Sequence, residues 1–574
     1  MTKIIEVFKR TEEIKIPIII ALVNTILKKI QFVEQLDKLI PWDEPRTNLS
    51  PGMLAKALVL STLFELRAPL SHISERFRTL DTEYLFGKDV TYEQINSFNI
   101  GRMLGKLGNC DCVNIFKMLV SMFFKEFMIR IKRLHSDTTT VTFSGDYTDI
   151  DEGNLTEEEK EELLHIVRGY NKDGRPEDKQ VVLGRITNED GLPIINEVLD
   201  GNTSDKEWNK KSLEYVYKLI EEGAEEAILV ADCKLVDEKL FRQMNDKDKK
   251  IPFISLCPAS FDEKLQERVI EKAYENKQWE DIGSIADGKK AAKYEVAEIS
   301  ENVYGYDTRL LVVYSTALES TVEEGIEKSK EKLEKLIKDT QKKKYECRED
   351  AEKELIQFKK AHKKLNLHDC ECRIEEEIKE TKANGRPSNN NPKPVTITTS
   401  YKIVIKITGE NPKKVEKYRH NKSCFVLISN VDKDRLDSKE LLETYKGQIV
   451  VETSFRYFKE GSLASVIFLK DPIRITGLIM LLNVSLLIRG LIQYSMRKGL
   501  KEYKKENPND ELRIGWNGQP LKAPTFKLFY KASEDNYFVK EGDEKYIINY
   551  YSDFNKLQVG MLLKFMGYKV QDLL

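Results

Sequence analysis

Apolar and polar residues recur with two different periods along the chain, and the changes of period divide it into regions. Over residues 16–107, apolar residues return at helical intervals, with breaks at Pro41 and at Ser50-Pro51. This pattern predicts that residues 1–115 form a helical N-terminal domain. Ser50 followed by Pro51 has the residue types that cap and begin a helix, so one of the predicted helices starts there.

Two of these predicted helices, over residues 52–67 and 71–78, are separated by an Ala-Pro break. The second helix carries Arg76 and Arg78. Helix, short break and basic helix are compatible with a helix-turn-helix that binds DNA. Most paired helices bind no DNA, so the pattern leaves DNA binding and dimerisation open as roles for this domain.

Residues 125–260 alternate between strand and helix patterns. Residues 129–145 are rich in β-branched residues and end at a glycine, and residues 179–200 predict two strands around an Asn-Glu-Asp-Gly turn. Residues 227–232, with the sequence AILVAD, predict a buried strand that delivers a carboxylate to the edge of a sheet. The remaining predicted elements are two helices and a strand, at residues 208–222, 237–244 and 251–256. This order is typical of an α/β core.

Residues 261–437 interrupt this core with a different pattern. Three segments are rich in strand-forming residues: 286–317, 395–406 and 423–429. Between them, residues 321–380 are highly charged, with apolar residues at helical intervals. They predict a long helical arm of one or two helices that pair as a coiled coil. Residues 384–392 are rich in Asn, Pro and Gly and predict a loop.

The last part of the chain returns to helical patterns. Residues 438–500 predict a helix over 441–460 and a strongly apolar helix from Asp471-Pro472 to Met496, packed under it. Residues 501–574 predict a helical C-terminal region with many aromatic residues.

Composition and charge narrow the class of protein. The chain has 574 residues, too many for one core, with 40% hydrophobic and 33% charged residues, as in a soluble globular protein. A net charge of −2 does not indicate a nucleic-acid binder, so a DNA enzyme of this composition must gather its basic residues on one face. The eight cysteines are scattered and the first residues lack the layout of a signal peptide, which predicts reduced thiols and a cytoplasmic location. The longest apolar run, residues 475–488, is too short to span a membrane, so no membrane partner is expected.

The helix predicted over residues 441–460 carries the candidate chemistry. Steps of three, four and seven residues return to nearly the same helix face, so Tyr445, Gln448, Glu452, Arg456 and Lys459 lie along one side. A carboxylate flanked by a phenol and two cations suits a site that holds a divalent metal ion and a phosphate. The alternative is a structural helix with charge pairs three to seven residues apart.

The spacing Tyr445-x2-Gln448-x3-Glu452-x6-Lys459 resembles the Tyr-x2-Arg-x3-Glu-x6-Lys signature of insertion-sequence transposases of bacteria and archaea. These are cut-and-paste DDE enzymes with a ribonuclease-H-like core. The chain departs from the signature at Gln448, which stands where the family has arginine. Arg456, one turn beyond Glu452, supplies positive charge to the same region.

The resemblance implies two further acids on upstream strands, and the matching residues are Asp137 and Asp232. By analogy with the family, Asp137, Asp232 and Glu452 are the catalytic residues and bind two Mg²⁺ ions, or Mn²⁺ in their place. Two such ions activate a nucleophile and neutralise charge on a phosphate in an in-line displacement. For each Asp alone, an edge or turn residue on a strand is the simpler interpretation.

Four residues of the signature helix are expected to bind DNA phosphates, again by analogy: Tyr445, Gln448, Arg456 and Lys459. The implied fold is an α/β ribonuclease-H-like catalytic core that is interrupted by a β-rich, coiled-coil insertion and flanked by N-terminal and C-terminal helical regions. The implied function is a DNA transposase that cuts at the ends of an insertion sequence and joins the freed 3′-OH to target DNA.

The implied partners are double-stranded DNA, both transposon ends and target, and a second copy of the chain in a homodimer. The cytoplasmic protein would associate with the nucleoid when it is bound to DNA. Two alternatives remain from the sequence. One is a ribonuclease-H-like nuclease or resolvase that cleaves without strand transfer, and the other is a non-catalytic DNA-binding scaffold derived from a transposase.

Overall fold

The structure is a computed structural model of a mixed α/β protein. It describes residues 14–574 except 44–48, 65–68, 144–162, 225, 286–290, 383–394, 461–468 and 542–544. The predicted loop at residues 384–392 lies outside the described residues. The chain forms two compact units. Unit 1 comprises Met1–Leu235, Leu240–Phe253 and Thr444–Leu574, and unit 2 comprises Val236–Lys239 and Ile254–Glu443.

The N-terminal part of unit 1 is mostly helical, as predicted. Its helices are α1 (Ile18–Lys29), α2 (Phe32–Leu39), α3 (Pro51–Ser61), α4 (Ile73–Phe77), α5 (Thr82–Phe86), α6 (Ser97–Gly108) and α7 (Cys112–Glu126). The predicted cap of α3 is confirmed, because the Ser50 side chain accepts a hydrogen bond from the backbone N–H of Met53.

The two helices predicted as a helix-turn-helix correspond to α3 and α4. Helix α4 is only five residues long, and Arg76 on it is half-buried. Its guanidinium lies 5.6 Å from the ring centroid of Phe64 and donates a hydrogen bond to the carbonyl oxygen of Ser61. Arg76 therefore packs within unit 1 rather than extending toward solvent as a DNA contact.

The strands and helices of the α/β part of unit 1 follow one another along the chain as the sequence predicts. Its strands are β2 (Arg133–Phe143), β3 (Lys179–Asn188), β4 (Pro193–Leu199) and β5 (Ile228–Ala231), in the order β4-β3-β2-β5. Strands β2, β3 and β4 are antiparallel neighbours, whereas β2 and β5 run parallel. The two helices of this stretch are α9 (Asp205–Glu221) and α10 (Glu238–Met244).

The single helix predicted over residues 441–460 is divided into two. Helix α15 (Ser438–Lys446) ends before Gly447, and α16 (Ile449–Lys459) begins after Gln448. The N–H groups of Gln448, Val450 and Val451 each donate to the carbonyl three residues earlier, which is the tighter turn of a 3₁₀ segment. Glycine has low helix propensity, so Gly447 is where the helix is interrupted most easily.

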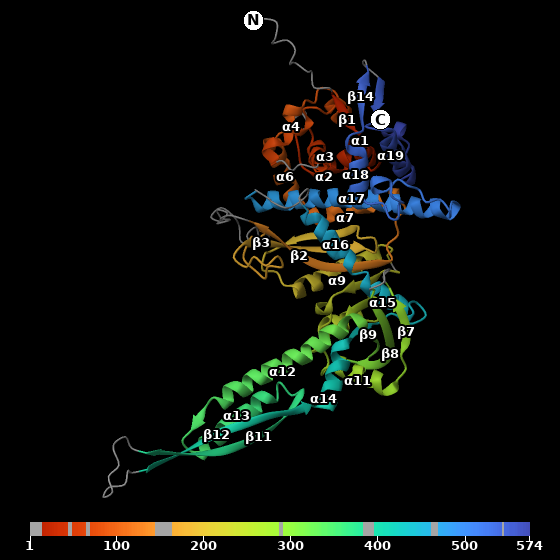
Figure 1. Cartoon of the computed structure of the whole chain (residues 1–574). Coiled ribbons are helices and arrows are strands. Elements are labelled where there is room, and N and C mark those ends of the chain that lie inside the picture. The colour runs from red at the N-terminus through yellow and green to blue at the C-terminus, as the bar shows by residue number, and fades with distance from the viewer. Residues whose placement is uncertain are drawn as a thin grey trace. The chain divides into compact units, whose positions relative to one another are not determined.

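The apolar helix α17 (Pro472–Glu506) lies at the centre of unit 1. In Figure 1, α3, α6 and α19 (Asp553–Phe565) lie on one side of it and α7 and the sheet on the other, and it contacts α3, α6, α7, α19 and β4. It approaches α6 closely, since a Cβ at Gly108 would lie 1.9 Å from the carbonyl oxygen of Ile473. Helix α17 is long and apolar enough to cross a membrane, but 83% of its most apolar window is buried in the structure, as in a core helix.

The C-terminal region is not purely helical, contrary to the prediction. Its elements are α18 (Phe526–Glu534), β14 (Tyr537–Glu541), β15 (Lys545–Asn549) and α19 (Asp553–Phe565). The hairpin β14–β15 is joined by β1 (Lys15–Pro17) from the start of the chain, which pairs antiparallel with β14. This pairing joins segments too far apart in sequence for a local pattern to reveal.

Unit 2 contains a set of neighbouring strands and an arm. The strands have the order β6-β13-β9-β8-β7, with β6 (Phe253–Leu256), β7 (Glu280–Ser284), β8 (Lys293–Val303), β9 (Tyr306–Ser315) and β13 (Cys424–Ser429). Helices α11 (Leu265–Asn276) and α14 (Pro412–Ser423) contact these strands. The three predicted strand-rich segments are all confirmed by β8, β9, β12 and β13.

The arm of unit 2 differs from the coiled-coil prediction. It consists of α12 (Glu319–Gln341), β10 (Lys344–Tyr345), α13 (Arg348–His362), β11 (His368–Lys382) and β12 (Val395–Glu410). The two helices pack on a long antiparallel ribbon of β11 and β12, and the shared core includes Leu333, Phe358 and Ile403. The helical pattern therefore ends at His362, and the segment from His368 is a strand.

Candidate active site

The first two predicted metal ligands, Asp137 and Asp232, are aligned by the register of β2 and β5. These strands are parallel, and His135 on β2 pairs with Val230 on β5. Asp137 and Asp232 each lie two residues further along, so the same register places them side by side. Strand β5 ends at Ala231, and Asp232 follows it directly, as the apolar run ending in an acid predicts.

Helix α16 is attached to β2 by the side chain of Gln448, which precedes it. Gln448 Nε2 donates a hydrogen bond to the Ser136 carbonyl oxygen (2.9 Å), and its Oε1 lies 3.1 Å from His135 Nδ1. His135 is 1% exposed, and this burial lowers its pKa to about 4, so the imidazole is neutral at pH 7. Alternate residues of a strand share a face, so Asp137 lies on the same face of β2 as His135, toward α16.

A buried arginine makes a second attachment between the sheet and α16. Arg185 on β3 donates from Nη1 to Ser454 Oγ (2.9 Å) and from Nε to Asn196 Oδ1 (2.6 Å), and it also donates to Asn483 on α17. Its guanidinium carbon lies 4.6 Å from the ring centroid of Phe455 on α16. These contacts fix the rotation of α16 about its axis.

With α16 held in this way, Asp137 and Glu452 line one open depression of about 610 Å³. Its other lining residues are Thr138, Thr139, Lys172, Phe455, Arg456, Lys459 and Glu460. Glu452 is exposed, and Arg456 and Lys459 follow it after one and two helical turns. The structure thus brings together two predicted metal ligands and two predicted phosphate-binding residues, with Asp232 beside Asp137 but outside the lining.

The carboxyl groups of Asp137 and Asp232 lie in an environment that disfavours their charged forms. Burial raises the pKa of Asp137 to about 6, and the nearby charges of Asp232 and Asp205 add to the rise. The Lys172 ammonium and the Thr138 N–H, 2.7 Å from Asp137 Oδ1, act in the opposite direction. Burial, together with Asp205, also raises the pKa of Asp232. Such a cluster is stabilised by added positive charge.

The other two predicted phosphate-binding residues lie differently from the prediction. Tyr445 is on α15, where burial raises its pKa to about 12 and the charges of Asp232 and Glu452 contribute. Its phenol is therefore close to both acids and remains protonated, so it is a hydrogen-bond donor at neutral pH. Gln448 directs its amide into the protein toward β2 rather than along the exposed side of α16.

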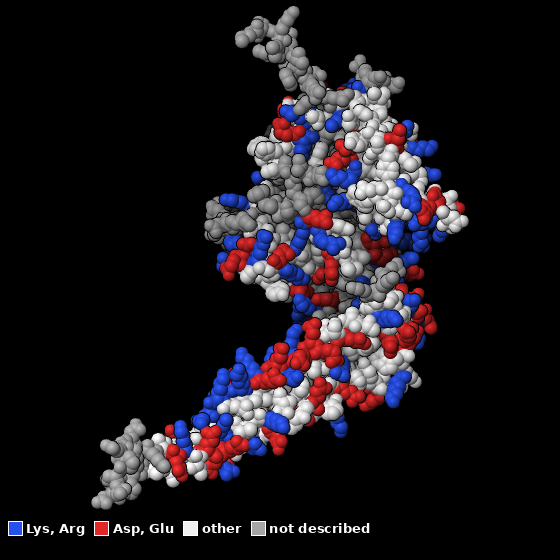
Figure 2. Space-filling model, in the orientation of Figure 1, with Lys and Arg blue, Asp and Glu red and all other residues white. Residues whose placement is uncertain are grey.

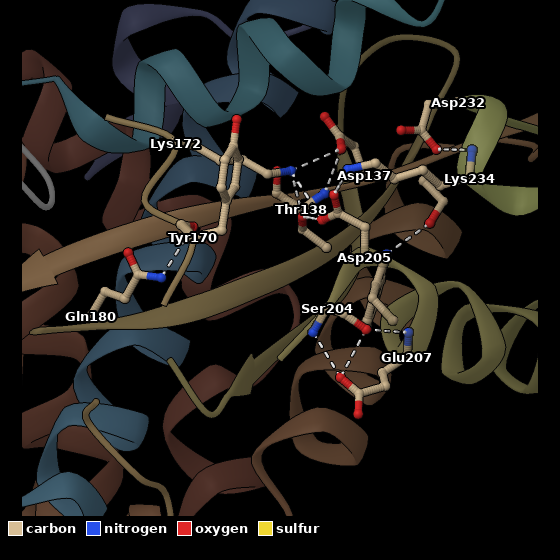
Figure 3. Close-up of polar contacts among 12 residues, drawn as sticks. Asp137, Thr138, Tyr170, Lys172, Gln180, Ser204, Asp205, Glu207, Asp232 and Lys234 are labelled. Carbon is tan, nitrogen blue, oxygen red and sulfur yellow. Dashed lines mark hydrogen bonds and ion pairs between the residues drawn. The ribbon is translucent and has the colours of Figure 1, made fainter. Parts of the chain in front are cut away.

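Sequence reasoning missed three charged residues of the site: Lys172, Asp205 and Lys234 (Figure 3). Asp205, the first residue of α9, accepts a hydrogen bond from Thr138 Oγ1 and pairs with Lys234 Nζ. Burial opposes its charge, but the bonds from Lys234 and Thr138 and the nearby Lys172 lower the pKa of Asp205 to about 2. Asp205 lies within the Ser204–Glu207 capping box that begins α9, so its sequence signal was that of a helix start.

The donor chemistry of the site fits Mg²⁺, because carboxylate oxygens are the ligands that this hard cation prefers. The placement of the donors does not fit. Among the residues that the structure describes, no three His, Cys, Asp or Glu side chains are grouped so that they could hold a metal ion. The cation that lies among the carboxylates is the Lys172 ammonium, 3.7 Å from Asp137 Oδ1 and 3.2 Å from Asp205 Oδ1.

Comparisons with known proteins add two similarities. Residues 13–121 match the model of a family described as a domain of unknown function, DUF4277. A cryo-EM structure of a piggyBac transposase synaptic complex with hairpin DNA is similar over 88% of this chain and 86% of that chain, with 10% identity and a TM-score of 0.30. No curated protein matches the chain. The family model spans only a small part of the chain, and a TM-score this low supports no conclusion about fold or function.

The distribution of surface charge bears on the expectation of a single basic face. On the face shown in Figure 2, Lys and Arg side chains are interspersed with Asp and Glu, and no large basic surface is visible there. The positive charge at the site is instead local, from Lys172, Arg456 and Lys459 around the depression.

Proposed function

We propose that this protein is a metal-dependent DNA transposase, which cuts DNA at the ends of an insertion sequence and joins the freed 3′-OH to target DNA. One observation carries the proposal. Three acids from separate elements, Asp137 in β2, Asp232 after β5 and Glu452 in α16, follow one another along the chain in the order of the DDE signature, and Asp137 and Glu452 line one depression with Arg456 and Lys459. The strand order β4-β3-β2-β5, with only the last pair parallel, supports a ribonuclease-H-like core.

In this proposal, Asp137, Asp232 and Glu452 would hold the metal ions only after the Lys172 ammonium has left the carboxylates, and bound ions would supply the charge that activates the attacking oxygen and neutralises the phosphate. Arg456 and Lys459 bind DNA phosphates next to the cut, where their charge offsets that of the backbone. Tyr445 donates a hydrogen bond from its protonated phenol. Gln448 has a different role from the family's arginine, since it positions α16 on β2. Work on two DNA ends at once requires a homodimer.

The first test is cleavage of duplex DNA that carries the sequence flanking this gene, in the presence of Mg²⁺ or Mn²⁺. We expect cleavage that leaves a 3′-OH, and a loss of roughly 1,000-fold in rate for Glu452→Gln, because metal-bound charge stabilisation is worth several kcal/mol. The matched control is Glu460→Gln, which removes the same charge from the other end of the depression. A supercoiled target plasmid in the same reaction reports strand transfer.

Each outcome separates the alternatives. Cleavage without joining would show that the protein is a nuclease or resolvase that uses the same site, and not a transposase. Equal traces of cleavage in the wild type and in Glu452→Gln, with DNA binding retained, would show that the protein is a DNA-binding scaffold.

A further inference from the structure

Residues 171–174, which we call the strap, place one positive and one negative side chain into the two halves of the site. Lys172 Nζ donates to the carbonyl oxygen of Thr138 (2.9 Å) and to Thr138 Oγ1 (2.6 Å), and it pairs with Asp137 and Asp205. An ammonium surrounded by four oxygens has the ligand environment of a hard cation. Figure 3 shows the Lys172 side chain reaching this group.

Asp173, the next residue of the strap, places a negative charge against a cation of α16. The two carboxylate oxygens of Asp173 lie 2.7 and 2.9 Å from Lys459 Nζ, the last cation of the signature. Both oxygens of this carboxylate contact one ammonium, as two oxygens of a phosphate can. Two consecutive residues of one loop, Lys172 and Asp173, thus form ion pairs with the acids of the site and with Lys459.

The loop is built to present these two side chains. Asn171 Nδ2 donates to Gln180 Oε1 (2.8 Å) and to Thr142 Oγ1 (3.2 Å), which anchors the strap to β3 and β2. Asn171 Oδ1 accepts from the N–H of Asp173 (2.8 Å), and Gly174 has φ +73°, which allows a tight turn. The Asn171 hydrogen bonds hold the backbone of the turn, so the Lys172 and Asp173 side chains can leave the site without unfolding the strap.

The contacts of the strap are also weak enough to be exchanged. The side chains of Lys172, Asp137 and Lys459 are 29, 27 and 28% exposed, and that of Asp173 is 38% exposed. Ion pairs with this much access to water contribute little net stability. A divalent metal ion carries twice the charge of the Lys172 ammonium that it would replace, and duplex DNA presents a series of phosphates against the single charge of Asp173.

We propose that the strap is an internal competitor that keeps the site closed until DNA and metal displace it. Lys172 takes the place of the metal ion among the carboxylates, and Asp173 takes the place of a phosphate on Lys459. This inference rests on the proposed function, and the contacts of Lys172 with Asp137 and Asp205 and of Asp173 with Lys459 carry it.

The phosphate half is tested by DNA binding in the presence of EDTA, measured as fluorescence anisotropy at one salt concentration. Asp173→Asn keeps the shape of the side chain and removes the competing charge, so we expect the Kd for duplex DNA to fall about tenfold. Asp178→Asn, on the same loop, is the matched control for the change of net charge. In a Lys459→Met background, Asp173→Asn is expected to change the Kd no more than Asp178→Asn does.

The metal half is tested by Mn²⁺ binding without DNA, measured by electron paramagnetic resonance. Lys172→Met is expected to lower the Kd for Mn²⁺ about fivefold, since it removes the competing ammonium, and Asp137→Asn is expected to abolish the tighter binding. Weaker Mn²⁺ binding by a folded Lys172→Met variant would overturn the proposal, because it would make Lys172 a support for the carboxylates.

Equal shifts in DNA affinity for Asp173→Asn and Asp178→Asn would also overturn the proposal that the strap competes with DNA. This proposal and the proposed enzymatic function can fail separately. DNA cleavage by the wild type with no change of affinity in Asp173→Asn overturns the strap alone. Tighter DNA binding by Asp173→Asn, with no cleavage by any variant under Mg²⁺ or Mn²⁺, overturns the catalytic function and supports the strap as a gate for DNA.

Discussion

Asp137 shows the conflict between stability and function at the scale of one residue. Its carboxyl is the most central acid of the site, and burial raises its pKa from 3.8 to about 6. The folded protein therefore binds this proton more tightly than the unfolded chain does, so the contribution to stability is present at low pH and is lost as the pH rises from about 4 to about 6.

We predict that Asp137→Asn stabilises the metal-free protein above pH 6 and abolishes cleavage. A shift of this size corresponds to at most about 3 kcal/mol, and water at the partly exposed carboxyl reduces it. The measurement is the urea midpoint of wild type and variant at pH 5 and pH 7.5. A stability difference that does not grow between these two pH values would contradict the raised pKa.

Residue-scale predictions from sequence succeeded where the signal was local. Asp232 was located because an acid after a short apolar run indicates the end of a buried strand. Lys172 was missed because a lysine in a polar loop has no local signal, and only its position against Asp137 and Asp205 distinguishes it from other surface lysines.

At the scale of elements, the placement of α16 depends on Arg185. Its side chain is fully buried, its hydrogen-bond partners are Asn196, Ser454 and Asn483, and burial lowers its pKa to about 9. A buried cation whose acceptors are all neutral costs more to desolvate than one paired with a carboxylate. The planar guanidinium of Arg185 stabilises this arrangement because it joins β3, α16 and α17.

We predict that Arg185→Met lowers the stability of unit 1 by about 2–4 kcal/mol, because three buried acceptors lose their donor while the cost of desolvating the cation disappears. The local readout is hydrogen exchange, in which α16 amides are expected to lose protection more than those of α19. Arg185→Lys is the companion variant, since it keeps the charge and loses the fork of donors. Unchanged hydrogen exchange in α16 would contradict the role of Arg185 in holding this helix.

Two elements show why periodicity misled the prediction. Residues 441–460 have a continuous helical pattern, yet Gln448 turns toward His135 and Ser136, and the helix is interrupted there. Residues 368–382 are so charged that they resemble the preceding helices. Their apolar positions Cys370, Cys372 and Ile374 alternate instead, and this strand period is the signal that was available.

At the scale of the whole molecule, the arm of unit 2 is an insertion between two neighbouring strands. Strands β9 and β13 pair antiparallel, with Tyr314 opposite Cys424, so the ends of the arm lie side by side. The arm has a core of its own that includes Leu333, Phe358 and Ile403. Its stability should therefore be separable from that of the sheet.

We predict that replacing residues 316–423, which comprise the arm and α14, by a short Asn-Gly turn leaves a folded protein, because such a turn connects antiparallel neighbours directly. The thermal transition of unit 1 is expected to move by less than about 3 °C, and the separate arm is expected to unfold cooperatively. Circular dichroism melts of the shortened chain, the arm and the full chain measure this. Loss of cooperative unfolding in the shortened chain would show that the arm is part of the fold of unit 2.

The sequence by itself determined those features that depend on neighbours along the chain. These are the cap of α3 at Ser50, the turn between β3 and β4, the strand that ends directly before Asp232, and the order of the three acids. The tertiary structure alone decided which side chains meet. The register of β2 and β5 aligns Asp137 with Asp232, Gln448 and Arg185 orient α16, and the strap brings Lys172 to the acids. Caps and periods are set by the local backbone, whereas these contacts join residues that are distant in sequence and depend on packing.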